Sequence, residues 1–318
     1  MFLKTKGSML LVAIQLVFIA ACTNRAQENS DEKLIGEINI DGSSTVFPIT
    51  EAIAKEFKVE QPDVKVTIGV SGTGGGFKKF AHAETQISNA SRAIKDSEIQ
   101  LCKKNRVKYI ALEVAYDGIA VMVNKENTWV DHLTVEELKL IWTPQAQGII
   151  KNWNQIRPEW PDKEIHLFAP GIASGTYDYF TEAIVGTSGS SRGDFATIED
   201  HNIFASAIKS DVLALGFSGL AYYEKYKADL KLVPIDNGNG PITPSIETIT
   251  NSTYQPLSRP LYIYINSKSA ENKAVKAFVR FYLDKASSLV KEVGYYTLQE
   301  AKYGKQKQKF EDFLNTIE

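Results

Sequence analysis

Residues 38–48 read INIDGSSTVFP, in which a short apolar run leads into Gly, Ser and Thr and then into a proline. The alternation of Ile38 and Ile40 predicts a strand, and Pro48 suits the first turn of a helix. The turn between them would bring free backbone N–H groups and hydroxyls to a helix N-terminus, which carries about half a positive charge. A strand, such a turn and a helix start together suit a small anion.

The same construction recurs at two further places. Residues 71–76 read SGTGGG after the period-two pattern of residues 64–70, and residues 173–176 read ASGT before another helical run. Each turn is weak evidence by itself, because Ser or Thr before a helix usually serves only as an N-cap. Three such turns in one chain favour a small tetrahedral oxyanion held by converging helix ends. The second turn is not a Walker A loop, since no Lys-Ser or Lys-Thr follows at the required spacing.

The rest of the chain alternates short β-like runs with helical runs, which predicts an α/β fold. The chain has 318 residues, and one core rarely keeps growing beyond about 250–300 residues, so we expect two lobes. A nucleic-acid-binding protein needs a clustered basic surface, and a chain with a net charge of −2 gives no indication of one. Further expected elements are a strand at 165–169 and helices with apolar stripes at Ile49, Ala52, Ile53 and Phe57, at Ile203, Ala207 and Ile208, at 274–283 and at 310–314.

The N-terminus has the pattern of an export signal. A short basic segment precedes the apolar residues 9–21, which are too few for a membrane span of about 20 residues but fit a signal-peptide core. The sequence IAAC at 19–22 resembles the bacterial lipobox, with Ile in place of the usual Leu; the alternative is a plain secretory signal in which Cys22 is incidental. We expect residues 1–21 to be a lipoprotein signal peptide, Cys22 to be lipidated, and residues 22–35 to form a flexible tether.

No pattern predicts catalysis, a metal or a cofactor. The four histidines lack the spacing of a zinc motif, and Cys102 is the only cysteine after Cys22. Ser174 lies in neither a G-x-S-x-G elbow nor a clear Ser-His-Asp arrangement. We therefore expect neither a catalytic residue nor a metal or cofactor site.

With these loops in view, the chain resembles the periplasmic phosphate-binding protein of the high-affinity phosphate importer. Six segments carry the resemblance in the family's order, at residues 41–48, 70–78, 87–92 (ISNASR), 116–124 (YDGIAVMVN), 174–176 and 256–266 (PLSRPLYIYIN). It implies a type II periplasmic binding fold, with mixed sheets flanked by helices, a ligand cleft between two lobes and two crossover strands. Lobe 1 would comprise 36–115 and 267–318, and lobe 2 with the hinge crossovers would comprise 116–266.

The resemblance also implies which residues hold the phosphate. The family binds it through hydroxyls and backbone N–H groups from both lobes. By position these are Ser44, Thr45 and the N–H of Val46 in the first loop, and Ser174, Gly175 and Thr176 in the second lobe. An extra glycine leaves two registers open in the second loop, so either Thr73 or Ser71 fills that place.

Two positions depart from well-known family members. Arg92 stands where some members place an aspartate that accepts the phosphate proton, and Pro170 stands where they place an arginine. We expect Arg92 to supply a bidentate guanidinium contact and Asp117 to accept the proton, as in a second branch of the family. The alternatives are a structural salt bridge for Arg92 and a hinge or turn cap for Asp117. A carboxylate acceptor would repel sulfate, which carries no proton near pH 7.

The implied partners are inorganic phosphate, the membrane permease and ATPase of an importer, and a membrane reached through the N-terminal lipid. The implied protein is monomeric, exported to the periplasm or cell surface, and does not bind nucleic acid. Three rivals stay open. They are a hydrolase of phosphate esters with Ser174 or Thr45 as nucleophile, a receptor for another oxyanion, and a sensing or adhesive relative that delivers nothing.

Overall fold

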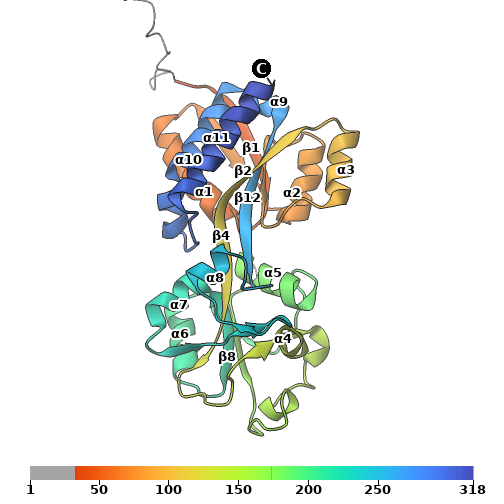
Figure 1. Ribbon diagram of the computed structural model, residues 1–318, viewed down its shortest axis with the longest axis vertical. Coiled ribbons are helices and arrows are strands. Elements are labelled where there is room, and N and C mark those ends of the chain that lie inside the picture. Colours follow the sequence, from red (N-terminus) through yellow and green to blue (C-terminus); the bar gives the residue numbers. More distant parts are fainter. Residues whose placement is uncertain (1–32, 173, 318) are drawn as a thin grey trace, which may run out of the picture. The chain divides into compact units, whose positions relative to one another are not determined.

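Two long antiparallel strands, β4 (Tyr109–Asn124) and β12 (Ser258–Asn266), run side by side along the middle of the fold (Figure 1). The computed structural model describes residues 33–172 and 174–317, so the signal peptide, Cys22 and nearly all of the tether lie outside the described residues. From Leu34 on, the chain forms one compact unit. Among the described residues, none of the helices combines the length and apolar character that a membrane crossing needs.

The sheet grows outward from this central pair in both directions. Beyond β12 lie β3, β1 and β2, and beyond β4 lie β8, β6 and β7, with β9 also paired to β4. The pairs among β1, β2 and β3 are parallel, as are β6 with β7 and β8, whereas the pairs made by β4 and β12 are antiparallel. The mixed α/β architecture predicted from the sequence is confirmed. These strands span Gly36–Gly42 (β1), Val64–Ile68 (β2), Ile87–Ala90 (β3), His166–Ala169 (β6), Ala196–Thr197 (β7), Ala214–Gly219 (β8) and Leu230–Leu232 (β9).

Helices flank the strands at both ends of the central pair. The part built on β1, β2 and β3, called the β1 half, carries α1 (Phe47–Glu60), α2 (Gly72–Ala81), α3 (Asp96–Lys104), α9 (Ser267–Ala270), α10 (Lys273–Glu292) and α11 (Glu300–Ile317). The part built on β8, called the β8 half, carries α4 (Val135–Trp142), α5 (Gly175–Phe180), a π-helical turn (Thr181–Val185), α6 (His201–Lys209), α7 (Leu220–Tyr226), α8 (Ile246–Thr250), two 3-10 turns (Pro144–Ala146, Trp153–Gln155) and the small sheet of β5 (Leu133–Thr134), β10 (Ile235–Asp236) and β11 (Pro241–Ile242).

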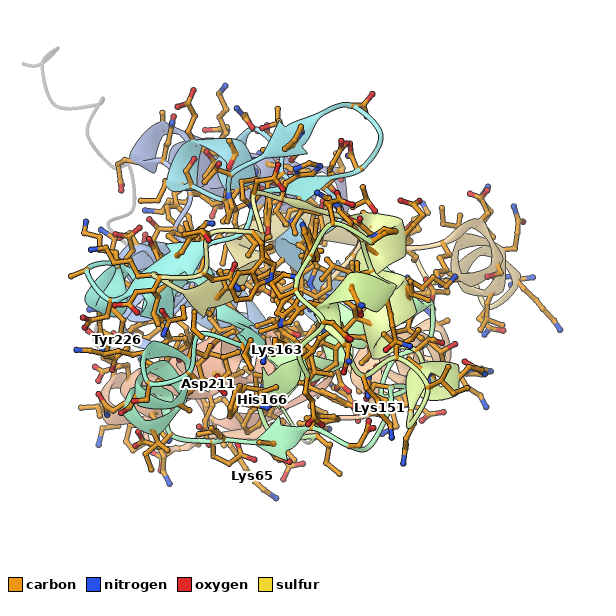
Figure 2. The ribbon with its side chains drawn as sticks, turned by 90° about the horizontal axis from the view of Figure 1, so that it is seen from below. Lys65, Lys151, Lys163, His166, Asp211 and Tyr226 are labelled. Atoms are coloured by element: carbon orange, nitrogen blue, oxygen red, sulfur yellow. The ribbon has the colours of Figure 1, made fainter. Side chains whose placement is uncertain are left out.

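The core explains why these elements stay in place. One hydrophobic cluster includes buried residues from both halves and from β4, whose segment from Ile119 to Val123 is almost fully buried. A smaller cluster beneath α2 and α3 holds Phe77, Phe80 and Tyr264. At the far end of the β8 half, His166 at the start of β6 lies 2.5 Å from Asp211, which precedes β8 (Figure 2). Burial on this scale supplies most of the stabilisation of such a fold, at about 25 cal/mol per Å² of apolar surface.

Two local predictions from the sequence are wrong. Residues 71–76 were expected to form a turn before a helix, but α2 already begins at Gly72, inside that turn. In α6 the predicted inward stripe contained Ile203, yet Ile203 is 61% exposed. Ile208 of that stripe is buried as predicted, but its buried neighbours are Phe204 and Ala205, because the helix capped by Asp200 turns its bulkiest side chain, Phe204, toward the core.

Candidate functional site

The first loop follows β1 and is shaped by Gly42. Gly42 has a φ of +140°, and a Cβ there would come within 2.1 Å of the Asn89 carbonyl oxygen, so only glycine fits. Ser43 N–H donates to that oxygen (3.0 Å), and Thr45 N–H donates to Ser43 Oγ (3.2 Å). The N–H of Val46, at the N-cap of α1, has no acceptor among the described residues. The loop thus presents the hydroxyls of Ser44 and Thr45 together with an unpaired N–H.

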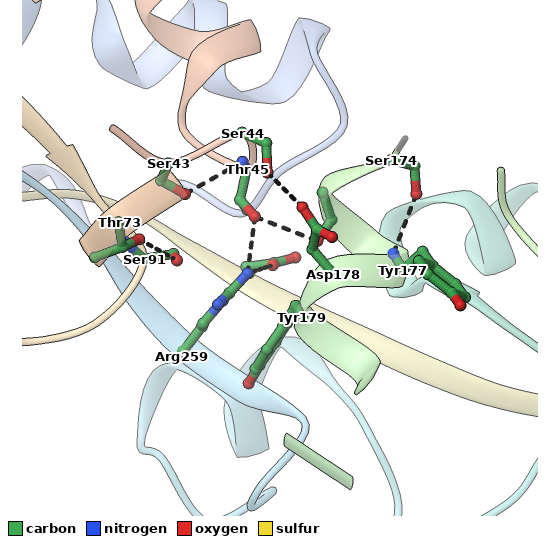
Figure 3. Close-up of polar contacts among 12 residues, drawn as sticks. Ser43, Ser44, Thr45, Thr73, Ser91, Ser174, Tyr177, Asp178, Tyr179 and Arg259 are labelled. Atoms are coloured by element: carbon green, nitrogen blue, oxygen red, sulfur yellow. Dashed lines mark hydrogen bonds and ion pairs between the residues drawn. The ribbon is translucent and has the colours of Figure 1, made fainter. Parts of the chain in front are cut away.

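The second loop is held by a buried carboxylate. Ser71 donates to Asp41 Oδ1 from both its N–H (3.0 Å) and its hydroxyl (2.5 Å), and Lys79 pairs with Oδ2 of the same residue. Burial alone would raise the pKa of Asp41, but the hydrogen bonds from Lys79 and Ser71 outweigh it and hold the pKa below its ordinary value. The hydroxyl of Ser71 is therefore committed to Asp41. Its rival Thr73 instead lies 3.0 Å from Ser91 Oγ, at the end of the third loop (Figure 3).

Arg92 makes the salt bridge that was its structural alternative. Its guanidinium donates to both carboxylate oxygens of Glu98, at 2.9 and 2.7 Å, and to the carbonyl of Ala93. The same group lies over the ring of Phe77, 5.5 Å from the centroid. Its role as a bidentate anion contact stays a prediction. Arg92 could make that contact only after its two hydrogen bonds to Glu98 were broken.

The loop of the β8 half meets the first loop directly. Ser174 caps α5 by accepting the Tyr177 N–H (3.1 Å). A Cβ on Gly175 would lie 2.8 Å from Thr45 Cα, so the two backbones touch. Thr45 donates its hydroxyl to the Gly175 carbonyl (3.3 Å), and Ser44 donates to Asp178 Oδ2 (3.0 Å; Figure 3). Thr176 lines the adjoining cavity.

Arg259 of β12 is a site residue that the sequence reasoning missed. Its Nη2 donates to Thr45 Oγ1 (2.8 Å) and lies 3.4 Å from Asp117 Oδ2, while its Cζ stands 3.4 Å from the ring centroid of Tyr179. Its Nε is buried and has no hydrogen-bond partner among the described residues. The available signal was a single cation inside the apolar segment PLSRPLYIYIN.

Asp117 lies in β4 opposite Arg259 and is 4% exposed. Burial raises the pKa of the Asp117 carboxyl, and the charge of Arg259 together with its hydrogen bond opposes that rise only in part. A carboxyl group in this state suits an exchange of a proton or hydrogen bond with a bound oxyanion. Three predicted site residues, Ser44, Asp117 and Ser174, line the same cavity.

A cavity of about 530 Å³ lies beside the contact between the two loops. Residues from both halves line it, and Ser44, Asp117, Ser174, Gly175 and Thr176 are among them. Its other lining residues are Phe47, Pro48, Val70, Pro170, Glu199, His201, Gly219, Tyr222, Val293, Gly294 and Tyr295. Within the described ranges, 33–172 and 174–317, no group of three or more His, Cys, Asp or Glu side chains is arranged to hold a metal ion.

Comparisons with known proteins show the family to which the chain belongs. The model of the PBP superfamily domain matches residues 27–286. Protein SphX of Synechocystis sp. is 48% identical over 92% of this chain and 85% of its own length, and the phosphate-binding protein PstS of Staphylococcus saprophyticus is 37% identical over 94% and 91%. The crystal structure of a possible phosphate-binding protein from Planctomyces limnophilus has a TM-score of 0.85 and 39% identity, over 88% of this chain and 99% of that one. An ABC-type phosphate transport receptor from Vibrio cholerae has a TM-score of 0.64 and 25% identity, over 82% and 100%.

Proposed function

Because the chain belongs to the PBP superfamily, in its PstS-like phosphate-binding branch, we propose that it binds inorganic phosphate between its halves and delivers it to the permease and ATPase of an ABC importer. The observation that carries this is the convergence of Thr45, Gly175 and Arg259 at one point, with an unpartnered guanidinium N–H beside them. A buried donor without a partner costs roughly 1–3 kcal/mol, and an oxyanion would relieve that cost.

The phosphate would be held by short donors from both halves. The N–H of Val46 comes from the β1 half, and so do the hydroxyls of Ser44 and Thr45, which would exchange their bonds to Asp178 and to the Gly175 carbonyl for bonds to the anion. Ser174 to Thr176 come from the β8 half. Thr73, with Ser91 beside it, fits the second-loop position better than Ser71, whose hydroxyl Asp41 already binds. We assign the guanidinium contact to Arg259, since the fork of Arg92 is occupied by Glu98.

Selectivity against sulfate is assigned to Asp117. Phosphate near pH 7 still carries a proton that a carboxylate accepts, whereas sulfate offers only negative charge. Placing that charge against a buried carboxylate costs several kcal/mol. The position of Asp117 beside the cavity and next to Arg259 supports this role.

Closure around the ligand would signal occupancy to the importer. We propose lobe 1 at 36–115 and 267–318, lobe 2 at 116–266, and a hinge where β4 and β12 pass between them. The contact of Thr45 with Gly175 belongs to the closed arrangement, and a phosphate that bridges both halves shifts the population toward it.

The remaining parts of the proposal concern location and chemistry. The protein is exported as a monomer and held at a membrane through lipid on Cys22. It performs no catalysis: the Ser174 hydroxyl accepts an N–H from Tyr177, and among the described residues no base is hydrogen-bonded to it. The absence of turnover with phosphate esters would support this point, and release of phosphate from an ester would overturn it.

Uptake in cells tests the transport role. Bacteria lacking their own phosphate-binding receptor should regain phosphate uptake when they express this chain together with its cognate permease and ATPase. The variant Arg259→Gln, exported to the same level, should not restore uptake. Failure of the unaltered, exported protein to restore uptake would contradict delivery to an importer.

A further inference from the structure

The cavity beside the phosphate loops stays open although the two halves touch on both sides of it. On one side Gly175 packs against Thr45, and on the other a Cβ on Gly294 would lie 2.7 Å from Tyr222 Oη. Gly294 follows α10 in the β1 half and Tyr222 belongs to α7 in the β8 half. Contacts between the two halves therefore lie on both sides of the cavity, and the cavity remains although these contacts are formed.

The volume exceeds what a phosphate ion fills. A water molecule takes about 30 Å³ of liquid, so an anion of five heavy atoms needs on the order of 100 Å³. The cavity measures about 530 Å³, which lies in the range of about 300–1,000 Å³ typical of pockets for small organic molecules. Most of it would remain unfilled with inorganic phosphate at the loops.

The chemistry of the lining changes away from the loops. Ser44 and Ser174 to Thr176 contribute hydroxyls and N–H groups, whereas the lining residues that lie outside the loops include the apolar and aromatic side chains of Tyr222, Val293 and Tyr295. A nonpolar wall next to an anion site suits a ligand with one charged end and one carbon-rich end.

The polar groups on that wall favour hydroxyls over further charge. The rings of His201 and Tyr222 are stacked with centroids 3.4 Å apart, and the hydroxyl-bearing side chains of Tyr222 and Tyr295 both line the cavity. Glu199 also lines the cavity, and its carboxylate would accept hydroxyl donors but repel a second phosphate. Aromatic faces combined with hydroxyl partners suit the ring or chain of a sugar or polyol.

We propose that the site also accepts phosphate monoesters of small sugars or polyols, with the phosphoryl group at the loops and the organic group along Tyr222, Val293 and Tyr295. This inference rests on the proposed phosphate site and extends its range of ligands. The monoester keeps the oxygens that the loops contact, and its carbon skeleton occupies the space that phosphate leaves empty.

Calorimetric titration of the protein, stripped of bound ligand, tests the proposal with inorganic phosphate, glycerol 3-phosphate and ribose 5-phosphate. Native mass spectrometry of each complex identifies the bound species and excludes free phosphate in the ester stocks. We expect one-to-one binding of ribose 5-phosphate that competes with phosphate. Tyr222→Leu should weaken ribose 5-phosphate about 10-fold, consistent with the loss of an aromatic contact, and change phosphate less than about 3-fold.

A second variant guards against a folding defect. Val293→Trp should fill the organic end of the cavity, abolish ribose 5-phosphate binding and retain phosphate binding, which itself shows that the variant is folded. Phosphate binding without any ester binding would overturn the inference and leave the phosphate function standing. Ester binding that both variants leave unchanged would overturn the placement, and failure of every ligand to bind would remove the proposed function as well.

Discussion

Arg259 and Asp117 lie directly opposite each other on the two strands that connect the halves, with Nη2 3.4 Å from Oδ2. Both side chains are largely buried, at 11% and 6% exposure. A buried ion pair gains little stability over apolar residues, and removing one partner leaves an uncompensated charge. Since Arg259 also donates to Thr45, this pair joins the two strands between the halves to the loop that would bind phosphate.

Replacing Asp117 with Asn should remove the discrimination against sulfate. The amide keeps the size of the carboxyl but no longer places negative charge against the anion, so sulfate should bind where it did not before. We expect the ratio of the two dissociation constants to fall at least 100-fold, in line with several kcal/mol for a buried like-charge contact. Unchanged selectivity, measured by competition calorimetry, would show that another group discriminates.

Arg259→Gln and Arg92→Gln separate the two candidate guanidinium contacts. The first should weaken phosphate by at least about 30-fold, because it removes a buried charge from the site. The second should lower the free energy of unfolding, through loss of the Glu98 bridge, and change phosphate affinity less than about 5-fold. A larger loss of phosphate affinity in Arg92→Gln than in Arg259→Gln would show that Arg92, and not Arg259, makes the guanidinium contact with phosphate.

Gly175→Ala should hinder closure without harming either half. The added methyl would lie 2.8 Å from Thr45 Cα and 2.9 Å from its nitrogen, and neither backbone atom can give way as a side-chain end would. Overpacking of this kind costs roughly 1–3 kcal/mol, so phosphate affinity should fall about 10- to 100-fold. Small-angle scattering should then show less compaction on adding phosphate, with the thermal midpoint nearly unchanged. Gly304→Ala, at a position where no atom lies within 4 Å of the added Cβ, is the matched control.

Much of this fold was predictable because its signals are local. Alternating residues such as Ile38 and Ile40 identify a strand, and Ser174 before Gly175 identifies a cap, since both depend on neighbours in the chain. The glycine-rich α2 was not predictable from propensity, because its helix is held by tertiary contacts: a Cβ on Gly76 would meet the backbone of Gly42 at 2.5 Å.

The site was predictable only in part, for a similar reason. The loop residues Thr45 and Ser174 carry a recognisable motif, but their partners come from distant parts of the chain. Arg259 reaches Thr45 across 214 positions, and no local pattern marks that contact. The position of Arg92 in the third loop predicts an anion contact, yet its guanidinium forms a salt bridge with Glu98, six residues later in the same half. Pairing partners of charged residues depend on tertiary structure, so a motif alone does not assign them.

Asp41→Asn should weaken the second loop and alter the acid stability. Because the folded-state pKa of Asp41 is lowered, its carboxylate stabilises the protein above the unfolded pKa of about 3.9, and that stabilisation is lost as the pH falls through the folded value. The difference in unfolding free energy between wild type and variant should therefore be present at pH 6 and shrink toward pH 3. Urea titrations at both pH values measure it, and an equal difference at both would contradict the ion pair with Lys79 and the hydrogen bonds from Ser71.

Cys22→Ala should release the protein from the membrane. Thioether-linked lipid at this position would carry the membrane affinity, so the variant should appear in the soluble fraction and lose labelling by a radioactive fatty acid. Cys102→Ala is the matched control, because that thiol is buried, and it should keep both the label and the membrane fraction. Labelling that survives Cys22→Ala would refute the lipid anchor.

Calorimetric titration of the soluble domain that begins after Cys22, stripped of ligand, with phosphate and then with sulfate at pH 7–8, tests the central claim most directly. The account predicts tight one-to-one binding of phosphate and no detectable heat with sulfate. Equal binding of both anions, or binding of neither, would contradict a phosphate receptor built on Thr45, Gly175 and Arg259.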